Sequence, residues 1–242
     1  MNLTEQFKKE EYKPVVYFDK DVDRLLLMDF TDANKELTAE IISDTDKFSK
    51  YINSRLQTTN LPTGQAGSRL GIGGYNEHRT VYSRSKVFDA PNAQEEPRRL
   101  HLGIDIWGNA GTEVFAPLNG VVHSFAFNDQ YGDYGATIIL FHQLEGYSFH
   151  SLYGHLSLRD LNGLTEGKQI KAGDTIAHFG APKENGHWPP HLHFQLIIDM
   201  EGKKGDYPGV CKFSEREKYL ANCPDPDLIM NMMQYAICIL NR

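Results

Sequence analysis

Residues 98–200 of this 242-residue chain form a succession of short β-branched and aromatic runs, separated by glycine turns. The runs GTEVFAPLNGVV, GATIILFHQ, YSFHSLYGHL and HLHFQLIID are typical of this stretch. Turn signals that recur about every 8–12 residues between such runs predict an antiparallel β-sandwich or open barrel. We therefore expect a mainly β protein whose core domain covers residues 98–200.

The chain before this core combines strand-like runs with a helical pattern. The runs PVVYF at 14–18 and RLLLMDF at 24–30 predict strands. Phe48, Ile52 and Leu56 recur at helical spacing and predict a helix that begins near Asp44. We assign residues 1–60 to an N-terminal α/β region. Residues 61–97 are interpreted as a Gly-rich linker and lead-in, because residues 60–76 hold six glycines or prolines.

Residues 201–242 predict a C-terminal loop followed by short helices. One helix is expected near residues 214–220, and an apolar helix over 228–240 should contribute its methionines to the core. The three cysteines, Cys211, Cys223 and Cys238, have no close CxxC spacing. This pattern favours free thiols in a reducing compartment, with a Cys211–Cys223 bridge as the alternative.

Charge and hydropathy exclude several classes of function. The net charge of −7, from 25 Lys and Arg against 32 Asp and Glu, argues against a nucleic-acid binder. No run approaches the roughly 20 apolar residues of a membrane span. The charged start MNLTEQFKKEEYK lacks the apolar segment of a signal peptide. We expect a cytoplasmic location for the chain as it stands, or a periplasmic or extracellular one if a leader has been removed. The oligomeric state stays open.

The chain holds ten histidines, and several of them lie in strand-like patterns. If HLGID forms a strand, His101 and Asp105 share one face with Gly103 between them, because strand side chains alternate. In HLHFQL, His191 and His193 share one face in the same way, and His155 ends the apolar run before it. A catalytic Zn²⁺ site takes three protein ligands and one water. The pattern therefore predicts a zinc site with an imidazole left over for proton transfer.

HLGID, LYGHLS and PHLHFQL, in this order, resemble the M23 family of zinc metallopeptidases, the lysostaphin- and LytM-like endopeptidases. The resemblance covers residues 99–198 and implies a core similar to a duplicated hybrid motif. It implies that His101, Asp105 and His193 bind one zinc ion per chain. It also implies that His191 acts as general base and His155 as the second catalytic histidine, although sequence alone leaves open which of the two is the base.

The runs DYGATIIL, GHWPPHLHFQ and GDYPGV resemble a narrower subgroup, the peptidase-like segment of larger proteins fused to kinase-like and class III aminotransferase segments. The main functional hypothesis is a zinc endopeptidase that cleaves peptide or peptidoglycan-type substrates. The alternative is a cytoplasmic zinc amide hydrolase that acts on a small non-wall substrate. A third reading, a non-enzymatic carrier with a lipoyl-like barrel, lacks the modifiable lysine hairpin that it requires.

Four further predictions concern residues around the motifs. Asn76 or His78 is a candidate fourth metal ligand, from a segment that would cover the groove. His187 and Trp188 are candidates for the lining of the cleft. Tyr153 is expected in the core, with contact to substrate as the alternative. Ordinary strand positions are expected for the remaining histidines of the β pattern: His123, His142, His150 and His178.

Overall fold

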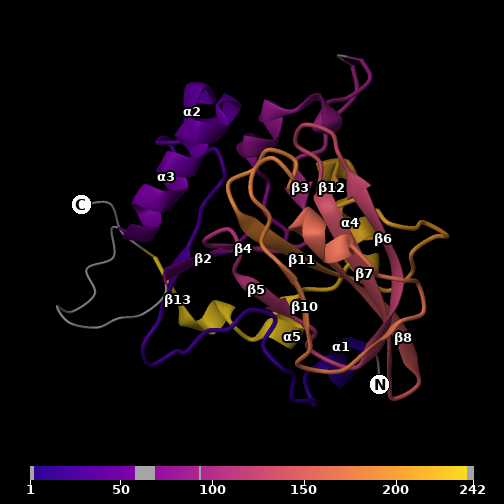
Figure 1. The fold of residues 1–242 in the computed structure, drawn as a ribbon. Helices are drawn as coiled ribbons and strands as arrows, with labels where there is room; N and C mark the ends of the chain where they lie inside the picture. Colours follow the sequence, from indigo (N-terminus) through magenta and orange to yellow (C-terminus); the bar gives the residue numbers. More distant parts are fainter. Residues whose placement is uncertain (1–2, 58–68, 93, 239–242) are drawn as a thin grey trace.

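The computed structural model describes residues 3–57, 69–92 and 94–238 (Figure 1). Its main feature is a nine-stranded sheet with the order β13-β1-β2-β4-β11-β8-β7-β6-β9. These strands are β1 (Arg24–Leu27), β2 (Arg69–Gly73), β4 (Ile104–Trp107), β6 (Gly120–Asn128), β7 (Gly135–Leu144), β8 (Tyr147–Leu156), β9 (Gln169–Ile170), β11 (His191–Ile197) and β13 (Ala236–Ile237). The two pairings of β1 are parallel, and all other pairings in the sheet are antiparallel. The predicted mainly β fold is confirmed.

Smaller elements complete the described part of the chain. Two two-stranded sheets pair β5 (Glu113–Phe115) with β10 (Thr175–His178), and β3 (Leu100–His101) with β12 (Val210–Cys211). The α-helices are α1 (Leu3–Phe7), α2 (Ala39–Ser43), α3 (Thr45–Gln57), α4 (Arg216–Asn222) and α5 (Asp227–Met230). No helix among the described residues is both long enough and apolar enough to span a bilayer.

Strand β11 shows why the alternating pattern places the site at the centre of the sheet. All seven of its residues are buried. Leu192, Phe194 and Leu196 belong to the main hydrophobic core, which also receives side chains from β4 and β8. His191 and His193 lie on the opposite face because successive strand residues point to opposite sides. The two histidines therefore lie on the buried side of a strand whose other face packs in the core.

The N-terminal region differs from the expectation at two places. Residues 14–18 form no strand; Val15 and Val16 are buried, and Val15 accepts one backbone hydrogen bond from Phe115. Part of the predicted linker is instead strand β2, which pairs with β4, while residues 58–68 lie outside the described part. Gly71 fits the close approach at this pairing, since a Cβ there would lie 3.2 Å from Cβ of its partner Trp107 and 2.7 Å from the Met28 side chain.

Helix α3 is present as predicted, and its first turn is capped by Asp44, whose Oδ1 accepts the backbone N–H groups of residues 46 and 47. Helices α2 and α3 pack beside the sheet (Figure 1). They do so through a second apolar cluster, which joins Phe48 and Ile52 to Trp107 of β4 and to Trp188. The N-terminal helices thereby support one wall of the site.

The predicted apolar helix over 228–240 is wrong. Helix α5 ends at Met230 because Asn231 adopts a left-handed conformation, with φ of 51°. Asp227 Oδ1 then accepts the backbone N–H groups of residues 232 and 233, and the chain leaves as β13 beside β1. Met230 and Met232 are buried in the core as expected, and residues 239–240 lie outside the described part.

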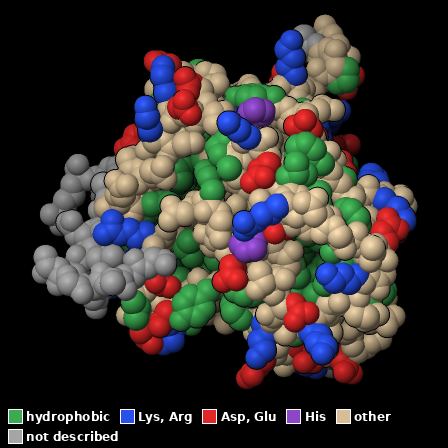
Figure 2. Space-filling view, in the orientation of Figure 1, with side chains coloured by type: hydrophobic (Ala, Val, Ile, Leu, Met, Phe, Trp, Pro, Cys, Tyr) green, Lys and Arg blue, Asp and Glu red, His purple; other side chains and the backbone are tan. Residues whose placement is uncertain are grey.

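Two further tail predictions agree with the structure. Helix α4 matches the helix expected near 214–220. All three cysteines are free of disulfides, with Cys211 and Cys223 buried and Cys238 exposed. On the face of the molecule in Figure 2, acidic and basic side chains are interspersed, without a single large basic patch.

Candidate metal centre

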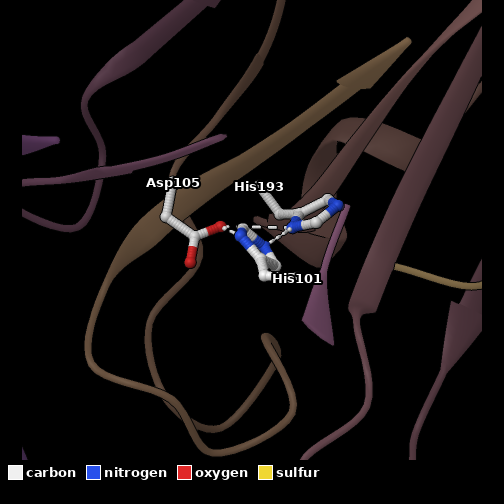
Figure 3. Close-up of side chains that lie close together, drawn as sticks. All are labelled: His101, Asp105 and His193. Atoms are coloured by element: carbon white, nitrogen blue, oxygen red, sulfur yellow. Dashed lines mark hydrogen bonds and ion pairs between the residues drawn. The ribbon is translucent and has the colours of Figure 1, made fainter. Parts of the chain in front are cut away.

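Strands β3, β4 and β11 bring His101, Asp105 and His193 together (Figure 3). Their ligand atoms all lie within 4.8 Å of one another, and among the described residues this is the one such group of three or more His, Cys, Asp or Glu side chains. The antiparallel register places His193 directly opposite Asp105. Gly103 leaves the necessary space, since a Cβ there would lie 2.6 Å from His193 Cε1.

One atom of each side chain faces the centre of the group. His101 Nε2 lies 2.8 Å from His193 Nδ1, and Asp105 Oδ1 lies 3.3 Å from the former and 3.1 Å from the latter. All three side chains are buried. The strands therefore hold two imidazole nitrogens and one carboxylate oxygen around one point.

The outer atom of each side chain has its own partner. His101 Nδ1 donates to the carbonyl oxygen of Gly74 at 3.0 Å, and His193 Nε2 donates to Gln195 Oε1 at 2.9 Å. Asp105 Oδ2 accepts a hydrogen bond from Arg79 Nη1 at 2.5 Å. Such outer partners fix the tautomer and orientation of metal-binding side chains.

This donor set fits a zinc ion. With the proton of each histidine on its outer nitrogen, two imidazole lone pairs and a carboxylate oxygen converge on one point, and this arrangement suits a shared cation. Zn²⁺ prefers nitrogen and oxygen ligands of this kind, whereas Mg²⁺ and Ca²⁺ prefer oxygen alone. Three protein ligands also leave one position for water or substrate, as in catalytic rather than structural zinc sites.

The electrostatics of the group favour this state. Burial raises the pKa of Asp105, but His101 and Arg79 beside it outweigh burial and hold this pKa well below its usual value. Burial, with Arg79 nearby, lowers the pKa of His101 to about 3. At neutral pH the carboxylate is therefore ionised and the His101 imidazole is neutral, which are the forms that bind a metal.

His155 and His191 form a second pair beside the group, with ring centroids 4.1 Å apart. Each ring donates from Nδ1 to a backbone carbonyl at 2.8 Å, from His155 to Asn185 and from His191 to Pro189. The His191 ring stacks on Trp107 at 4.0 Å and 14°. Both rings are therefore fixed with Nε2 as a proton acceptor.

Burial and nearby histidines lower the pKa of His155 well below 6.5, and burial lowers the pKa of His191 to about 4. Both imidazoles are thus neutral at pH 7. A neutral imidazole with a free lone pair is the form that a general base requires. His155 also has a left-handed backbone, with φ of 62°, and such strain concentrates at functional sites.

A cavity of about 220 Å³ adjoins both histidine groups. Its wall includes His155, His191, His193 and Trp188, so Trp188 lines the cavity as expected. His187 is not part of the wall and stacks on Tyr131 instead. Segments before the core contribute further aromatic and apolar side chains, among them Val81, Tyr82, Val87 and Phe88.

The expected fourth ligands lie elsewhere. Asn76 Oδ1 accepts a hydrogen bond from Arg216 Nε at 2.8 Å, and the His78 ring packs 6.0 Å from Phe213. The same segment does reach the metal group, through the Arg79 side chain and the carbonyl oxygen of Gly74. Sequence reasoning missed Arg79 because no periodicity links a loop arginine to a carboxylate 26 residues later.

Sequence reasoning also missed Tyr134, whose Oη lies 3.3 Å from His193 Nε2 and which lines the cavity. Tyr153 is fully buried in the core, as expected from the sequence. The four other histidines named above lie in strands β6, β7, β8 and β10, as expected: His123, His142, His150 and His178.

Residues 99–206 match the model of peptidase family M23. An uncharacterized metalloprotease of Haemophilus influenzae is 33% identical over 101 residues. The match spans 42% of this chain but only 19% of that relative.

Solved structures give partial similarities. The catalytic domain of the antimicrobial peptidase lysostaphin from Staphylococcus simulans is 20% identical, covering 71% of this chain and 96% of that one, with a TM-score of 0.39. LytU is 22% identical, covering 71% and 97%, with a TM-score of 0.38. A zinc containing peptidase from Vibrio cholerae is 23% identical, covering 46% and 31%, with a TM-score of 0.34.

Proposed function

From the M23 peptidase domain over residues 99–206, we propose that this protein is a zinc-dependent metalloendopeptidase that cleaves peptidoglycan-type peptides. The observation that carries the proposal is the convergence of His101, Asp105 and His193 beside a pair of neutral histidines on one cavity wall. His101 Nε2, Asp105 Oδ1 and His193 Nδ1 would hold the ion. A bound zinc ion supplies a Lewis acid that polarises a carbonyl group and makes water acidic near neutral pH.

The chain itself supplies the proton transfer. His191 presents Nε2 as an acceptor, and its stacking on Trp107 holds the ring plane. We assign His191 as the general base that takes a proton from water and returns it to the leaving amine. His155, 4.1 Å away between ring centroids, is assigned as the second catalytic histidine, which hydrogen-bonds the reacting groups at the same cavity wall.

The size of the cavity favours a second candidate function. Ligand pockets for drug-sized molecules usually span about 300–1,000 Å³, and this cavity holds about 220 Å³. Residues 79–98 contribute part of its wall, so the groove is narrowed by side chains from outside the M23 segment. A zinc amide hydrolase for a small non-wall substrate is therefore the alternative.

Two measurements test the function. Metal analysis of the purified chain should find about one zinc per chain. Hydrolysis should then be measured on isolated peptidoglycan and, in parallel, on a panel of small peptides and amides, with chelator and with zinc added back. Chelator-sensitive release of peptides from peptidoglycan supports the endopeptidase, whereas cleavage of the small panel alone supports the amide hydrolase. Hydrolysis that persists in chelator refutes both.

Variants separate the proposed roles. H101A and H193A should lose zinc, whereas H155A and H191A should keep zinc and lose turnover. H178A is a matched control, because His178 contacts Asp160 and lies outside the cavity wall. Full activity of H191A would remove the assignment of that histidine as the base.

A further inference from the structure

We propose that Arg79 is a positioning residue that holds Asp105 as a one-oxygen ligand of the metal site, an inference that rests on the proposed function. The Arg79 side chain is 2% exposed and the Asp105 side chain 3%. Arg79 Nη1 donates to Asp105 Oδ2 at 2.5 Å, while Asp105 Oδ1 faces the two histidines. One carboxylate oxygen is thus committed to the arginine, and the other is left for the ion.

The guanidinium is held on several sides. Arg79 Nε donates to Glu77 Oε2 at 2.6 Å, and Nη2 donates to the carbonyl oxygen of Gly73 at 3.2 Å. The ring of Phe30 lies 5.1 Å from the guanidinium carbon. A Cβ on Gly74 would lie 1.7 Å from Nη2, so only glycine leaves room for the arginine there. Because these contacts hold the fork, its Nη1–H stays directed at Asp105 Oδ2, which leaves Oδ1 facing the histidines.

The same loop also holds a second member of the group. The carbonyl oxygen of Gly74 accepts the His101 Nδ1–H, one residue after Gly73 accepts a bond from Arg79. The segment from Gly73 to Arg79 therefore orients both His101 and Asp105 from outside the group. A carboxylate limited to one oxygen keeps the remaining coordination position open for water or substrate, as a catalytic site requires.

A double-mutant cycle on the full chain tests this role. Zinc affinity is measured by competition with a chromogenic chelator for the wild type, R79M, D105N and the R79M/D105N pair. R79M should weaken zinc binding about 10–100-fold, the usual effect of losing an outer partner of a metal ligand. In the D105N background, R79M should weaken binding no further, because the ligand through which Arg79 acts is gone.

R84M is the matched control. Arg84 is another largely buried arginine, with its guanidinium 4.5 Å over the Trp188 ring. It donates hydrogen bonds to Thr45, Tyr131 and the carbonyl oxygen of His187, away from the metal group. Zinc affinity of R84M should equal that of the wild type. Visible absorption of the Co²⁺-loaded proteins gives a second readout, since freeing Asp105 Oδ2 in R79M should shift the spectrum from four-coordinate towards higher coordination.

Specific outcomes overturn the proposal. Wild-type zinc affinity in R79M means that Arg79 does not act through this carboxylate. The same conclusion follows if R79M lowers zinc affinity as much in the D105N background as in the wild type. If R79M fails to fold, R79K keeps the buried charge but not the planar fork, and wild-type affinity together with an unchanged Co²⁺ spectrum in R79K overturns the proposal. Failure of the wild type to bind zinc refutes the proposed function instead, so the two failures are distinguishable.

Discussion

His142 should make the protein acid-sensitive by an amount that the structure allows us to work out. The side chain is fully buried in β7, where Nδ1 donates to the carbonyl oxygen of Asn119 at 2.9 Å and Nε2 lies 2.7 Å from Ser151 Oγ. Burial lowers the pKa of His142 to about 4, against about 6.5 in an unfolded chain. The folded state therefore resists a proton that the unfolded state accepts.

The sign and size follow directly. Above pH 6.5 both states hold a neutral imidazole, so this histidine does not alter stability with pH. Between pH 6.5 and about 4 only the unfolded state gains the proton, so the free energy of unfolding falls as the pH falls. A gap of about 2.5 pKa units at about 1.4 kcal/mol per unit gives a loss of roughly 3.5 kcal/mol at most.

Urea unfolding at about pH 7 and about pH 4.5 measures this loss. H142Q should be less stable than the wild type at pH 7, because Gln does not reproduce both imidazole hydrogen bonds. On acidification its free energy of unfolding should fall by roughly 2–3 kcal/mol less than that of the wild type, because Gln has no imidazole to protonate in the unfolded state. S151A is the matched control: it removes the neighbouring hydroxyl, keeps the imidazole and should retain the acid loss. An H142Q variant that loses as much stability as the wild type between the two pH values would refute the reasoning.

Three further predictions concern the site and the tail. Gly103→Ala places a Cβ 2.6 Å from His193 Cε1 and should weaken zinc binding about 10–100-fold, measured by chelator competition, because His193 must move. Trp107→Leu removes the stacked support of His191 and should lower turnover at least about 10-fold at unchanged zinc content; unchanged turnover would show that the stack is dispensable. Asn231→Ala should destabilise the chain by about 1 kcal/mol in thermal unfolding, whereas Asn231→Gly should not, because the left-handed turn that ends α5 disfavours a Cβ.

Strand β11 was predictable because its two faces are chemically distinct. The period of two in HLHFQL separates Leu192, Phe194 and Leu196 from His191 and His193, and the structure buries both sets. Residues 14–18 and 228–240 also have apolar patterns. An apolar pattern does not show whether a neighbouring strand is available to pair with residues 14–18, or where a helix that begins near residue 228 ends. In the tail, Asp227 and the left-handed Asn231 end the helix after one turn.

The sequence pattern accounts for part of the metal group. Asp105 and His193 lie in the runs HLGID and HLHFQL, and the antiparallel register of β4 and β11 sets them opposite each other. His101 lies on the separate strand β3, and the left-handed backbone of His155 interrupts the alternation of β8. Their partners outside these runs were not predictable. Arg79 and Tyr134 contact the group from outside these runs, and such contacts depend on the path that the chain takes through space. Residue spacing and composition do not reveal that path.

The cavity wall combines residues of the M23 match with residues on both sides of it, and this division bears on which substrate enters. The match contributes Asp105 and three histidines, whereas Val81, Tyr82, Val87 and Phe88 come from before it and residues 207–210 from after it. The histidines would perform the same chemistry on any amide within reach, so the motif alone does not select the substrate. The segment before the match contributes large side chains to the wall and so helps to set the size of the cavity. Because that segment also carries Arg79, which bonds Asp105, changes that widen the cavity for a larger peptide must preserve the Arg79–Asp105 contact if the metal site is to survive them.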